Sequence, residues 1–420
     1  MRQATRTQWI KCTIAILLYL AFLIWVRSWW GLIVVPFIFD IYITKKIPWS
    51  FWKKSKNPTV RNVMSWVDAI VFALVAVYFV NIYIFQNYQI PSSSLEKSLL
   101  VGDFLYVSKM SYGPRKPMTP LSMPLVANEL PITGTKSYIE WPQWEYERVK
   151  GFGKIKLNDI VVFNYPSGDT VALAQSQQDF YSMCYQAGEE LYPVDGLANM
   201  PWQEQMDEFA KQYSFGRNYI LGHPEQFGKV ISRPVDHREN YVKRCVALPG
   251  DTFEISQAHY KVRGCNMPLG NVDSQDGLRR IIENGRERDW RIVMSGYPYN
   301  ELVNWDIMNF GPLYLPAKGD EVEMNPEHAA FYKNAIEWEQ KKKLFLRGDT
   351  VLLNDSVIYA YRFKENYYFV TGDKVMNSQD SRYWGLLPEP LIVGKAVRIW
   401  KSVDREKDRI RWDRIWKRIE

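Results

Sequence analysis

Apolar residues gather in three long segments near the start of the chain. They cover residues 12–26 (CTIAILLYLAFLIWV), 28–44 (SWWGLIVVPFIFDIYIT) and 63–85 (VMSWVDAIVFALVAVYFVNIYIF). The first and third approach the roughly 20 residues that a helix needs to cross the hydrocarbon of a bilayer. Pro36 and Asp40 interrupt the second, so the pattern leaves open whether there are two or three membrane crossings. These segments predict a membrane anchor.

The charges that flank the apolar segments predict their orientation. Basic residues are concentrated between the second and third segments: Lys45, Lys46, Lys53, Lys54, Lys56 and Arg61. Positively charged loops stay on the cytoplasmic side, so residues 45–62 should be cytoplasmic and everything after about Asn87 should lie outside. A cleaved signal peptide is the alternative for the first segment, but no small-residue cleavage site follows it.

Beyond residue 90 the pattern changes to short β-branched and aromatic runs separated by turn residues. Gly-Asp, Asn-Asp and Pro-Gly pairs punctuate the runs, as is typical of antiparallel strands joined by tight turns. The runs are residues 103–110, 159–166, 240–255, 349–363, 366–373 and 392–400. This pattern predicts a mainly β fold, in which an antiparallel β domain follows the membrane-anchoring α-helices.

Two stretches break the strand pattern and predict helices. They are residues 200–213 (MPWQEQMDEFAKQY) and 325–343 (NPEHAAFYKNAIEWEQKKK), the second beginning with a capping Asn and a first-turn Pro. We place them in insertions at about 176–235 and 266–344. The predicted organisation is one or two transmembrane helices in 1–44, a basic cytoplasmic loop in 45–62, a transmembrane helix in 63–86, a β domain in 87–400 and a charged amphipathic tail in 401–420. The tail is expected to form a solvated helix or to touch anionic lipid.

Composition and charge exclude some classes of function. With 47% hydrophobic residues and a net charge of +7, the chain is neither disordered nor strongly basic. Much of the positive charge lies in the first 62 residues, and neither zinc-type cysteine pairs nor basic-aromatic repeats occur, so no nucleic-acid partner is expected. The cysteines are Cys12, Cys184, Cys245 and Cys265, and a Cys245–Cys265 disulfide would be allowed in an oxidising compartment.

The candidate chemistry lies just after the third apolar segment, in residues 88–113 (YQIPSSSLEKSLLVGDFLYVSKMSYG). A serine nucleophile needs a base, and none of the histidines sits in a nucleophile-like setting. Lysine is the other documented base for serine, provided that burial keeps it unprotonated near neutral pH. Lys243 in the apolar run NYVKRCVAL fits this requirement, although a strand lysine with its amine in water would give the same pattern.

Five segments resemble, in their order, the sequence boxes of type I signal peptidases. They are QIPSSSL, FLYVSKMSYG, DIVVFNYP, YVKRCVALPGD and GDKVMNSQDSRYWGLLPEPLIVGKA. The resemblance covers roughly residues 63–175, 236–260 and 345–400. Several boxes in order after a membrane segment carry it, since any one box alone is weak. It implies a β domain of signal-peptidase type and a serine endopeptidase that uses a Ser–Lys dyad.

The resemblance also implies roles for individual residues. The family pattern Pro-Ser-x-Ser-Met places the nucleophile on Ser94, with Leu95 in the Met position. It puts the hydroxyl of Ser92 and the backbone N–H of Ser94 in the oxyanion hole. The Tyr-x-Lys-Arg box places the general base on Lys243, beside Arg244.

The last box, residues 372–382, both matches the family pattern and departs from it. By resemblance, Ser378 orients the amine of Lys243, while Asp380 and Arg382 form a supporting ion pair. Lys374 stands where the family has Asn, and a Val-Met pair at 375–376 replaces a more polar pair. The effect of these changes on the supporting network is left open.

The substrate that the resemblance implies is the signal peptide of an exported preprotein, which would add as a strand between the segments before Ser94 and Lys243. Ile90 and Val242 match family positions that wall shallow pockets for small side chains, as in A-x-A-like sites. No cofactor and no metal are implied. The expected location is the bacterial plasma (inner) membrane, multi-pass, with the catalytic domain on the periplasmic side. Membrane lipid and the secretion machinery are the further expected partners.

Two other functions stay compatible with the sequence. A catalytically inactive relative could bind signal peptides or membrane partners without cutting them. The changes at 374–376 and the two insertions allow this, whereas the intact Ser94, Lys243 and Ser378 oppose it. A self-cleaving protease of the repressor type shares the Ser–Lys dyad, but such proteins are soluble and cytoplasmic, unlike a chain with a membrane anchor.

Overall fold

A computed structural model of the protein describes residues 4–123, 126, 128–130, 133–166, 170–175, 178, 180–197, 200, 202–283, 296–300, 302–303, 305–376, 378–404 and 407–419. The chain divides into two compact units. The helical unit is Met1–Gln86 with Lys109–Gly153, and the sheet unit is Asn87–Ser108 with Lys154–Glu420. Residues 109–153, which the sequence assigns to the β domain, therefore belong to the helical unit.

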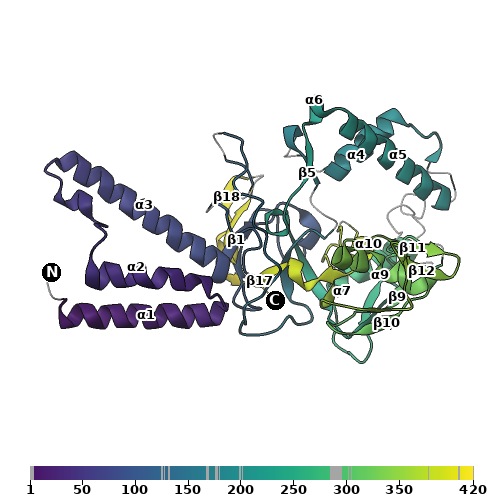
Figure 1. The fold of residues 1–420 in the computed structure, drawn as a ribbon. Coiled ribbons are helices and arrows are strands. Elements are labelled where there is room, and N and C mark those ends of the chain that lie inside the picture. Colours follow the sequence, from purple (N-terminus) through teal and green to yellow (C-terminus); the bar gives the residue numbers. More distant parts are fainter. Residues whose placement is uncertain are drawn as a thin grey trace. The chain divides into compact units, whose positions relative to one another are not determined.

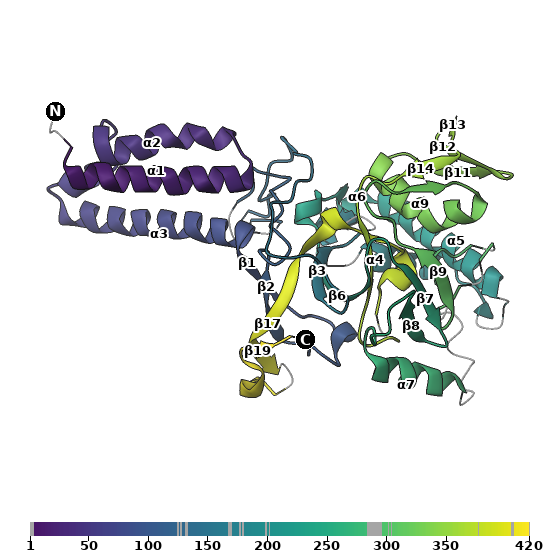
Figure 2. The ribbon, with the colours of Figure 1, turned by 90° about the horizontal axis from the view of Figure 1, so that it is seen from below.

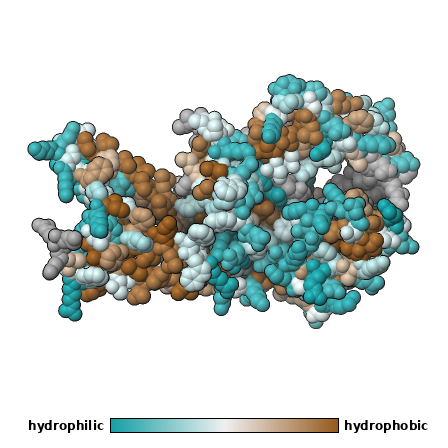
Figure 3. All heavy atoms as spheres, in the orientation of Figure 1, coloured by the Kyte–Doolittle hydropathy of each residue, from teal (hydrophilic) through white to brown (hydrophobic). Residues whose placement is uncertain are grey.

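The helical unit is built on α1 (Arg6–Val26), α2 (Val35–Phe39) and α3 (Pro58–Tyr83), which lie side by side in Figures 1 and 2. Helix α1 begins at a capping box formed by Thr5 and Gln8. Both α1 and α3 are long and apolar enough to cross a membrane. No residue of α3 is buried, and apolar side chains cover the helices in Figure 3. Lipid is the solvent that tolerates such a surface, so these helices fit a membrane anchor.

The second apolar segment is not one continuous helix. It divides into η1 (Trp30–Val34), α2 and the π-helical turn η2 (Asp40–Thr44). The Asp40 carboxylate accepts hydrogen bonds from the N–H groups of Lys46 at 2.8 Å and Ile47 at 3.1 Å, which turn the chain away at this point. The apolar stretch Trp30–Thr44 is therefore shorter than a typical span. The basic loop that follows contains η3 (Phe51–Lys54).

The segment 109–153 is fixed to the end of α1 by hydrogen bonds. The indole N–H of Trp25 donates to the carbonyl of Lys150 at 3.1 Å, and Lys116 Nζ donates to the carbonyl of Arg27 at 3.2 Å. Its described residues form isolated β-bridges, for example between Arg115 and Arg148, and they form no β-strand. These contacts explain why the segment belongs to the helical unit.

The sheet unit is organised by a nine-stranded sheet in the order β1-β2-β17-β3-β6-β15-β16, with β18 and β19 paired to β17. The pairs around β3, β6, β15 and β17 are antiparallel, which confirms the mainly β fold. The strands are β1 (Phe85–Gln89), β2 (Asp103–Ser108), β3 (Ile160–Asn164), β6 (Asn240–Ala247), β15 (Tyr367–Thr371), β16 (Leu387–Pro388), β17 (Ile392–Asp404), β18 (Arg409–Ile410) and β19 (Lys417–Arg418).

Four smaller sheets complete the strands of this unit. They pair β4 (Thr170–Ala172) with β5 (Val230–Ser232), β7 (Thr252–Ser256) with β8 (His259–Val262) and β9 (Phe310–Tyr314), β10 (Glu321–Glu323) with β14 (Ala360–Arg362), and β12 (Thr350–Leu353) with β11 (Leu344–Arg347) and β13 (Ser356–Val357). Aromatic side chains join the small sheets to the large one. The rings of Phe253 and Phe369 lie 4.4 Å apart in a core that is closed to solvent.

Both expected insertions contain helices, but only the first is mainly helical. It holds α4 (Phe180–Leu191), α5 (Trp202–Gly222) and α6 (Pro224–Phe227). The second holds α7 (Val272–Glu283) and α9 (Pro326–Gln340), and also supplies β9 and β10 to two sheets. The capped start of α9 is confirmed, since the Asn325 side chain accepts from the N–H of His328 at 2.7 Å. The remaining short helices are η4 (Ser93–Leu95), η5 (Leu173–Gln175), η7 (Val235–His237), α10 (Ser381–Trp384), η9 (Glu389–Leu391) and η10 (Trp412–Arg414).

The charged tail differs from the expected helix. Its described residues continue β17 to Asp404 and then form β18, η10 and β19, which fold back on β17. Backbone pairing with β17 satisfies the polar groups of the tail, so a helix is not needed. Cys245 and Cys265 are both free thiols, the first buried and the second half-buried, so the allowed disulfide is not formed.

Candidate active site

Ser94 lies in the segment that links β1 to β2. After β1 the chain turns through Pro91 and forms the short helix η4. Leu95 and Leu99, each 1% exposed, anchor this segment in an apolar cluster beneath the sheet. The Leu99 N–H donates to the carbonyl of Leu95 at 2.7 Å, which closes the turn. These contacts hold the buried Ser94 in a fixed position.

Lys243 lies on β6, between β3 and β15 in the middle of the large sheet. Residues 243–247 are all buried, so the amine of Lys243 is enclosed, with only 3% of the residue exposed. Its Nζ lies 2.7 Å from Ser94 Oγ. The predicted pair is thus brought into hydrogen-bond contact across 149 positions of sequence.

The surroundings of Lys243 favour its neutral form. The pKa of the Lys243 amine is lowered to about 8 as the net result of burial, which lowers it most, of the Asp380 and Asp373 carboxylates, which raise it, and of the Arg382 guanidinium, which lowers it. A neutral amine is the form that can take a proton from a serine hydroxyl. The arrangement therefore suits a general base that works near neutral and mildly alkaline pH.

Ser92 lies on the solvent side of the nucleophile. It is exposed, and its hydroxyl oxygen lies 3.4 Å from Ser94 Oγ, where either hydroxyl could donate. A hydrogen-bond donor beside the attacking oxygen can stabilise the oxyanion that develops there. The position fits the role that the sequence assigns to Ser92, which stays a prediction.

The loop after β15 supplies the charged groups behind Lys243. Arg382 donates to the Asp380 carboxylate at 2.8 Å from both Nε and Nη2, and both side chains are fully buried. The Gly372 N–H donates to Asp380 Oδ2 at 2.9 Å, which ties the pair to the end of β15. The structure therefore forms the ion pair that the sequence predicts.

Ser378 is close to the dyad but does not form its expected hydrogen bond. A Cβ on Gly372 would fall 2.2 Å from Ser378 Oγ and 2.7 Å from the carbonyl oxygen of Ser94, so glycine lets the two segments meet. The hydroxyl of Ser378 is buried and has no hydrogen-bond partner among the described residues. Its role in orienting Lys243 stays a prediction.

Two more buried polar atoms in the loop after β15 lack a hydrogen-bond partner among the residues that the structure describes. They are Arg382 Nη1 and Trp384 Nε1. Unpaired buried polar groups are uncommon because each costs on the order of 1–3 kcal/mol. Unpaired buried polar groups are typical of functional regions, which keep features that lower the stability of the fold.

Arg244 forms a second ion pair, on the opposite face of β6 from Lys243. Its Nε and Nη2 donate to the two oxygens of Asp373, at 2.8 and 2.9 Å. Its Nη2 also donates to Ser98 Oγ at 2.9 Å, and Ser98 donates in turn to Asp373. Arg244 therefore connects the strand of the base to the segment of the nucleophile. The sequence assigned Arg244 a supporting role but gave no signal for Ser98.

Arg414 makes a further contact that the sequence did not predict. It donates to both oxygens of the buried Asp103 carboxylate, at 3.1 and 2.6 Å, and to the carbonyl of Ser98 at 3.1 Å. A lone arginine in a charged tail carries no sequence signal for such a partner. The contact holds the tail against the segment that carries Ser94.

The two predicted pocket residues lie in one apolar cluster. Ile90 is buried, and Val242 is half-buried and packs against the same group of side chains. The Ile90 N–H donates to the carbonyl of Asp103, and its own carbonyl accepts from Gly102. The structure thus brings Ile90 and Val242 together beside the dyad, while their contact with a substrate stays a prediction.

The departures at 374–376 lie outside the dyad. The Lys374 side chain is exposed and pairs with Glu96 at 2.6 Å, whereas its N–H donates to the carbonyl of Ser94 at 2.9 Å. Val375 is buried in an apolar cluster, against which the half-buried Met376 packs. Because the backbone makes the contact to Ser94, the change of side chain at 374 leaves that contact in place.

Comparison with known proteins agrees with this geometry. A family model described as signal peptidase, peptidase S26, matches residues 63–401. The chain belongs to the signal peptidase family, peptidase S26. Its members are serine endopeptidases, so the chain is a peptide-bond hydrolase.

Individual relatives are distant but cover most of the chain. Signal peptidase I of Buchnera aphidicola subsp. Acyrthosiphon pisum is 24% identical over 361 residues, which are 85% of this chain and 80% of the relative. Signal peptidase I of Haemophilus influenzae is 24% identical over 373 residues, 84% of this chain and 74% of the relative. Signal peptidase I of Aquifex aeolicus is 22% identical over 330 residues, 78% and 80% respectively. The resemblance to type I signal peptidases is therefore confirmed.

Proposed function

We propose that this chain removes signal peptides from exported preproteins, with Ser94 as nucleophile and Lys243 as general base. The observation that carries the proposal is the 2.7 Å contact between Lys243 Nζ and Ser94 Oγ at a buried site. No histidine is needed for this chemistry, because a buried lysine amine can take the serine proton.

The reaction follows from these positions. The neutral Lys243 amine takes the proton of the Ser94 hydroxyl as Oγ attacks the carbonyl carbon of the scissile bond. The negative oxygen of the tetrahedral intermediate faces the Ser92 hydroxyl and the N–H of Ser94. The Lys243 ammonium then gives its proton to the leaving amine, which releases the mature protein. Water, deprotonated by Lys243, attacks the acyl-enzyme, and Lys243 then returns the proton to Ser94 Oγ as the signal peptide is released.

The pocket residues suit a substrate with small side chains before the cleaved bond. Ile90 and Val242 belong to one apolar cluster, and we expect a shallow pocket that they line to favour alanine-like residues, as at A-x-A sites. A signal peptide would add as a strand beside this segment and use backbone hydrogen bonds for affinity. Substrate identity would then depend on small size and extended shape.

We also propose that the sheet unit faces away from the cytoplasm. The basic loop 45–62 supports this orientation, since positive loops stay inside, and α3 then leads outward. A bacterial plasma membrane, with the catalytic unit on the periplasmic side, fits the bacterial relatives named above. Membrane lipid and the secretion machinery are the partners that this placement implies.

Cleavage of a preprotein by the purified, detergent-solubilised protein tests the proposed activity. We expect wild type to release the signal peptide at a single site and Ser94→Ala to lose at least about 10³-fold in rate, because the nucleophile is missing. Ser93→Ala is the matched control, since it removes a neighbouring hydroxyl only, and it should keep most of the activity. A folded wild-type protein that binds the preprotein but never cuts it would support the inactive alternative instead.

Accessibility to an impermeant thiol reagent tests the orientation. In a background with Cys265→Ser, Asp355→Cys places a thiol at an exposed turn of the sheet unit. It should react in intact spheroplasts. Lys54→Cys, in the exposed basic loop, should react only after lysis. The reverse pattern of labelling would overturn the proposed topology.

A further inference from the structure

We propose that a cavity between helix α9 and the α10–β16 segment binds an apolar or aromatic side chain of the substrate polypeptide, downstream of the bond that Ser94 attacks. This inference rests on the proposed function and extends it to the mature side of the substrate. It assigns substrate selection to helix α9, which lies in the second insertion.

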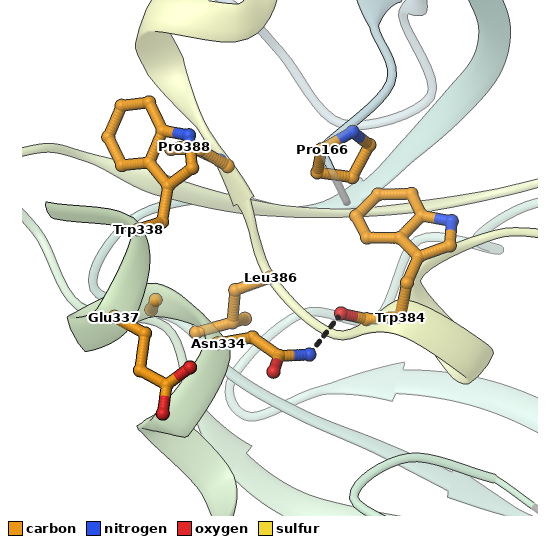
Figure 4. Close-up of a pocket in the computed structure, with 8 residues that line it drawn as sticks. Pro166, Asn334, Glu337, Trp338, Trp384, Leu386 and Pro388 are labelled. Atoms are coloured by element: carbon orange, nitrogen blue, oxygen red, sulfur yellow. Dashed lines mark hydrogen bonds between the residues drawn. The ribbon is translucent and has the colours of Figure 1, made fainter. Parts of the chain in front are cut away.

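The cavity has a volume of about 310 Å³ and lies where the end of β3, helix α9 and the α10–β16 segment meet. Figure 4 shows its walls, among them Pro166, Trp338, Trp384, Leu386 and Pro388. A dry cavity of about 150 Å³ already accepts benzene. The space is therefore large enough for one aromatic side chain.

The carboxylate that lines the cavity, Glu337, already has partners within the protein. Glu337 lines the cavity, but its Oε1 accepts from the N–H of Leu344 and its Oε2 pairs with Lys343, each at 3.0 Å. Asn334 Nδ2 donates to the carbonyl of Trp384 at 3.2 Å and joins α9 to α10, as the dashed line in Figure 4 marks. Indole and proline surfaces remain, and they favour an apolar guest over a charged one.

Packed aromatic side chains connect the strand of Lys243 to the wall of this cavity. Side chains alternate along a strand, so Tyr241 shares the face of Lys243, and Val242 points to the other face. Phe163 lies opposite Tyr241 in the sheet, with ring centroids 6.3 Å apart. The Trp384 ring, which lines the cavity, lies 5.9 Å from Phe163.

The direction of the substrate follows from the chemistry. Lys243 must reach the leaving amine to protonate it, so the downstream chain begins at the face of Lys243 and Tyr241. The upstream side chains are expected at Ile90 and Val242, on the other face. Two residues of strand and the two ring spacings add up to roughly 19 Å, which is an upper limit for the separation, so at about 3.3 Å per residue the cavity lies within reach of a residue up to roughly six positions downstream of the cleaved bond.

Kinetics with paired substrates test the proposal. The pair is one preprotein with Phe and the same preprotein with Ala at each of positions four to six downstream. We expect wild type to cleave the Phe form with a roughly tenfold higher kcat/KM, carried mainly by KM. Trp338→Ala should remove this preference, and Trp338→Phe should restore most of it. Tyr359→Ala, which changes an exposed aromatic residue outside the cavity, should keep it.

A structural effect of Trp338→Ala would lower the rates on both substrates equally and leave their ratio unchanged. That result would overturn the subsite while leaving the Ser94-dependent cleavage intact. If Ser94→Ala cleaved as fast as wild type, the proposed function itself would fail. The two failures are therefore distinguishable in one set of assays.

Photo-crosslinking gives a second readout that does not depend on turnover. Ser94→Ala is incubated with preproteins that carry a photoreactive phenylalanine analogue at single positions on either side of the cleavage site. Positions four to six downstream should crosslink to the peptide that contains residues 326–340, whereas upstream positions should not. Crosslinks to 326–340 from upstream positions only would contradict the proposed direction.

Discussion

Two walls enclose the Ser94–Lys243 pair, and they are held by different forces. The nucleophile wall, residues 88–100, depends on backbone hydrogen bonds, on apolar anchors such as Leu95 and Leu99, and on the hydrogen bonds that Ser98 accepts from two arginines. The support wall, residues 372–384, depends on the fully buried Asp380–Arg382 pair, and several of its polar atoms lack a partner among the described residues. Many contacts that each stabilise weakly hold the nucleophile wall, whereas a few strong contacts hold the support wall.

This difference predicts how each wall responds to substitution. A neutral hydrogen bond contributes about 1 kcal/mol, so the nucleophile wall should tolerate the loss of a single contact. Removing one partner of a buried ion pair costs about 3–5 kcal/mol, because the other charge is left unpaired. We therefore expect the base and its support to be the more sensitive part of the site.

The largest effect in this comparison is expected at the base. Lys243→Arg should lose at least about 10³-fold in kcat/KM, as should Lys243→Ala, because a guanidinium does not deprotonate in the working range. In wild type the amine must be neutral, so activity should rise with pH through the Lys243 pKa of about 8. Initial rates on one preprotein from pH 6 to 10 measure both effects. A folded Arg variant with near-normal activity would rule out Lys243 as the base.

Next come the two charges of the support wall, which should shift the pH profile in opposite directions. The Asp380 carboxylate raises the pKa of Lys243 and the Arg382 guanidinium lowers it. Asp380→Asn should therefore move the rise in activity to lower pH, and Arg382→Met should move it to higher pH. Each should also destabilise the protein by about 3–5 kcal/mol.

The double variant Asp380→Asn with Arg382→Met is the control for that destabilisation. It leaves neither charge buried alone, so it should unfold at a higher temperature than either single variant. Thermal unfolding in detergent, followed by circular dichroism, measures the order. Shifts of the pH profile in the same direction for both single variants would contradict the electrostatic account.

A smaller effect is expected for Ser378→Ala. If Ser378 orients the Lys243 amine during catalysis, its loss should slow kcat roughly tenfold, the equivalent of about one hydrogen bond. The same change removes a buried hydroxyl without a partner among the described residues, so the melting temperature should stay the same or rise. An unchanged kcat would show that Ser378 has no orienting role.

The smallest effect is expected for Lys374→Asn, which introduces the residue that the family pattern favours. Lys374 pairs with Glu96 at the surface, and exposed ion pairs contribute about 0–1 kcal/mol. The backbone N–H that contacts Ser94 is unchanged. Activity should therefore stay within about twofold of wild type in a parallel assay. A larger loss would show that the lysine side chain takes part in the site.

Local pattern was sufficient to predict some of these features. The apolar runs at 12–26 and 63–85 are long enough to identify α1 and α3 without tertiary information. The family resemblance added the position of the base, Lys243, which the local pattern left open, and its contact with Ser94 is present. The fold class was also predictable, because turn residues recur between short β-branched runs.

Features that depend on contacts with backbone groups were not predictable from the sequence. The tail reads as an amphipathic helix, but β17 offers its edge to β18 and β19. Asp40 looks like an interruption in an apolar run, and it binds the backbone of the residues that follow. In each case the deciding contact is made by backbone groups, so the periodicity of the side chains cannot reveal it.

The contact of Arg414 with Asp103 and Ser98 has a consequence for biosynthesis. The segment that carries Ser94 is made early in translation, whereas Arg414, which braces it, follows Ser98 by 316 positions. Because the chain is made from its N-terminus, the nucleophile segment exists without this brace until the tail has been made and has docked. We therefore expect a newly made molecule to hold its nucleophile segment less firmly during that interval.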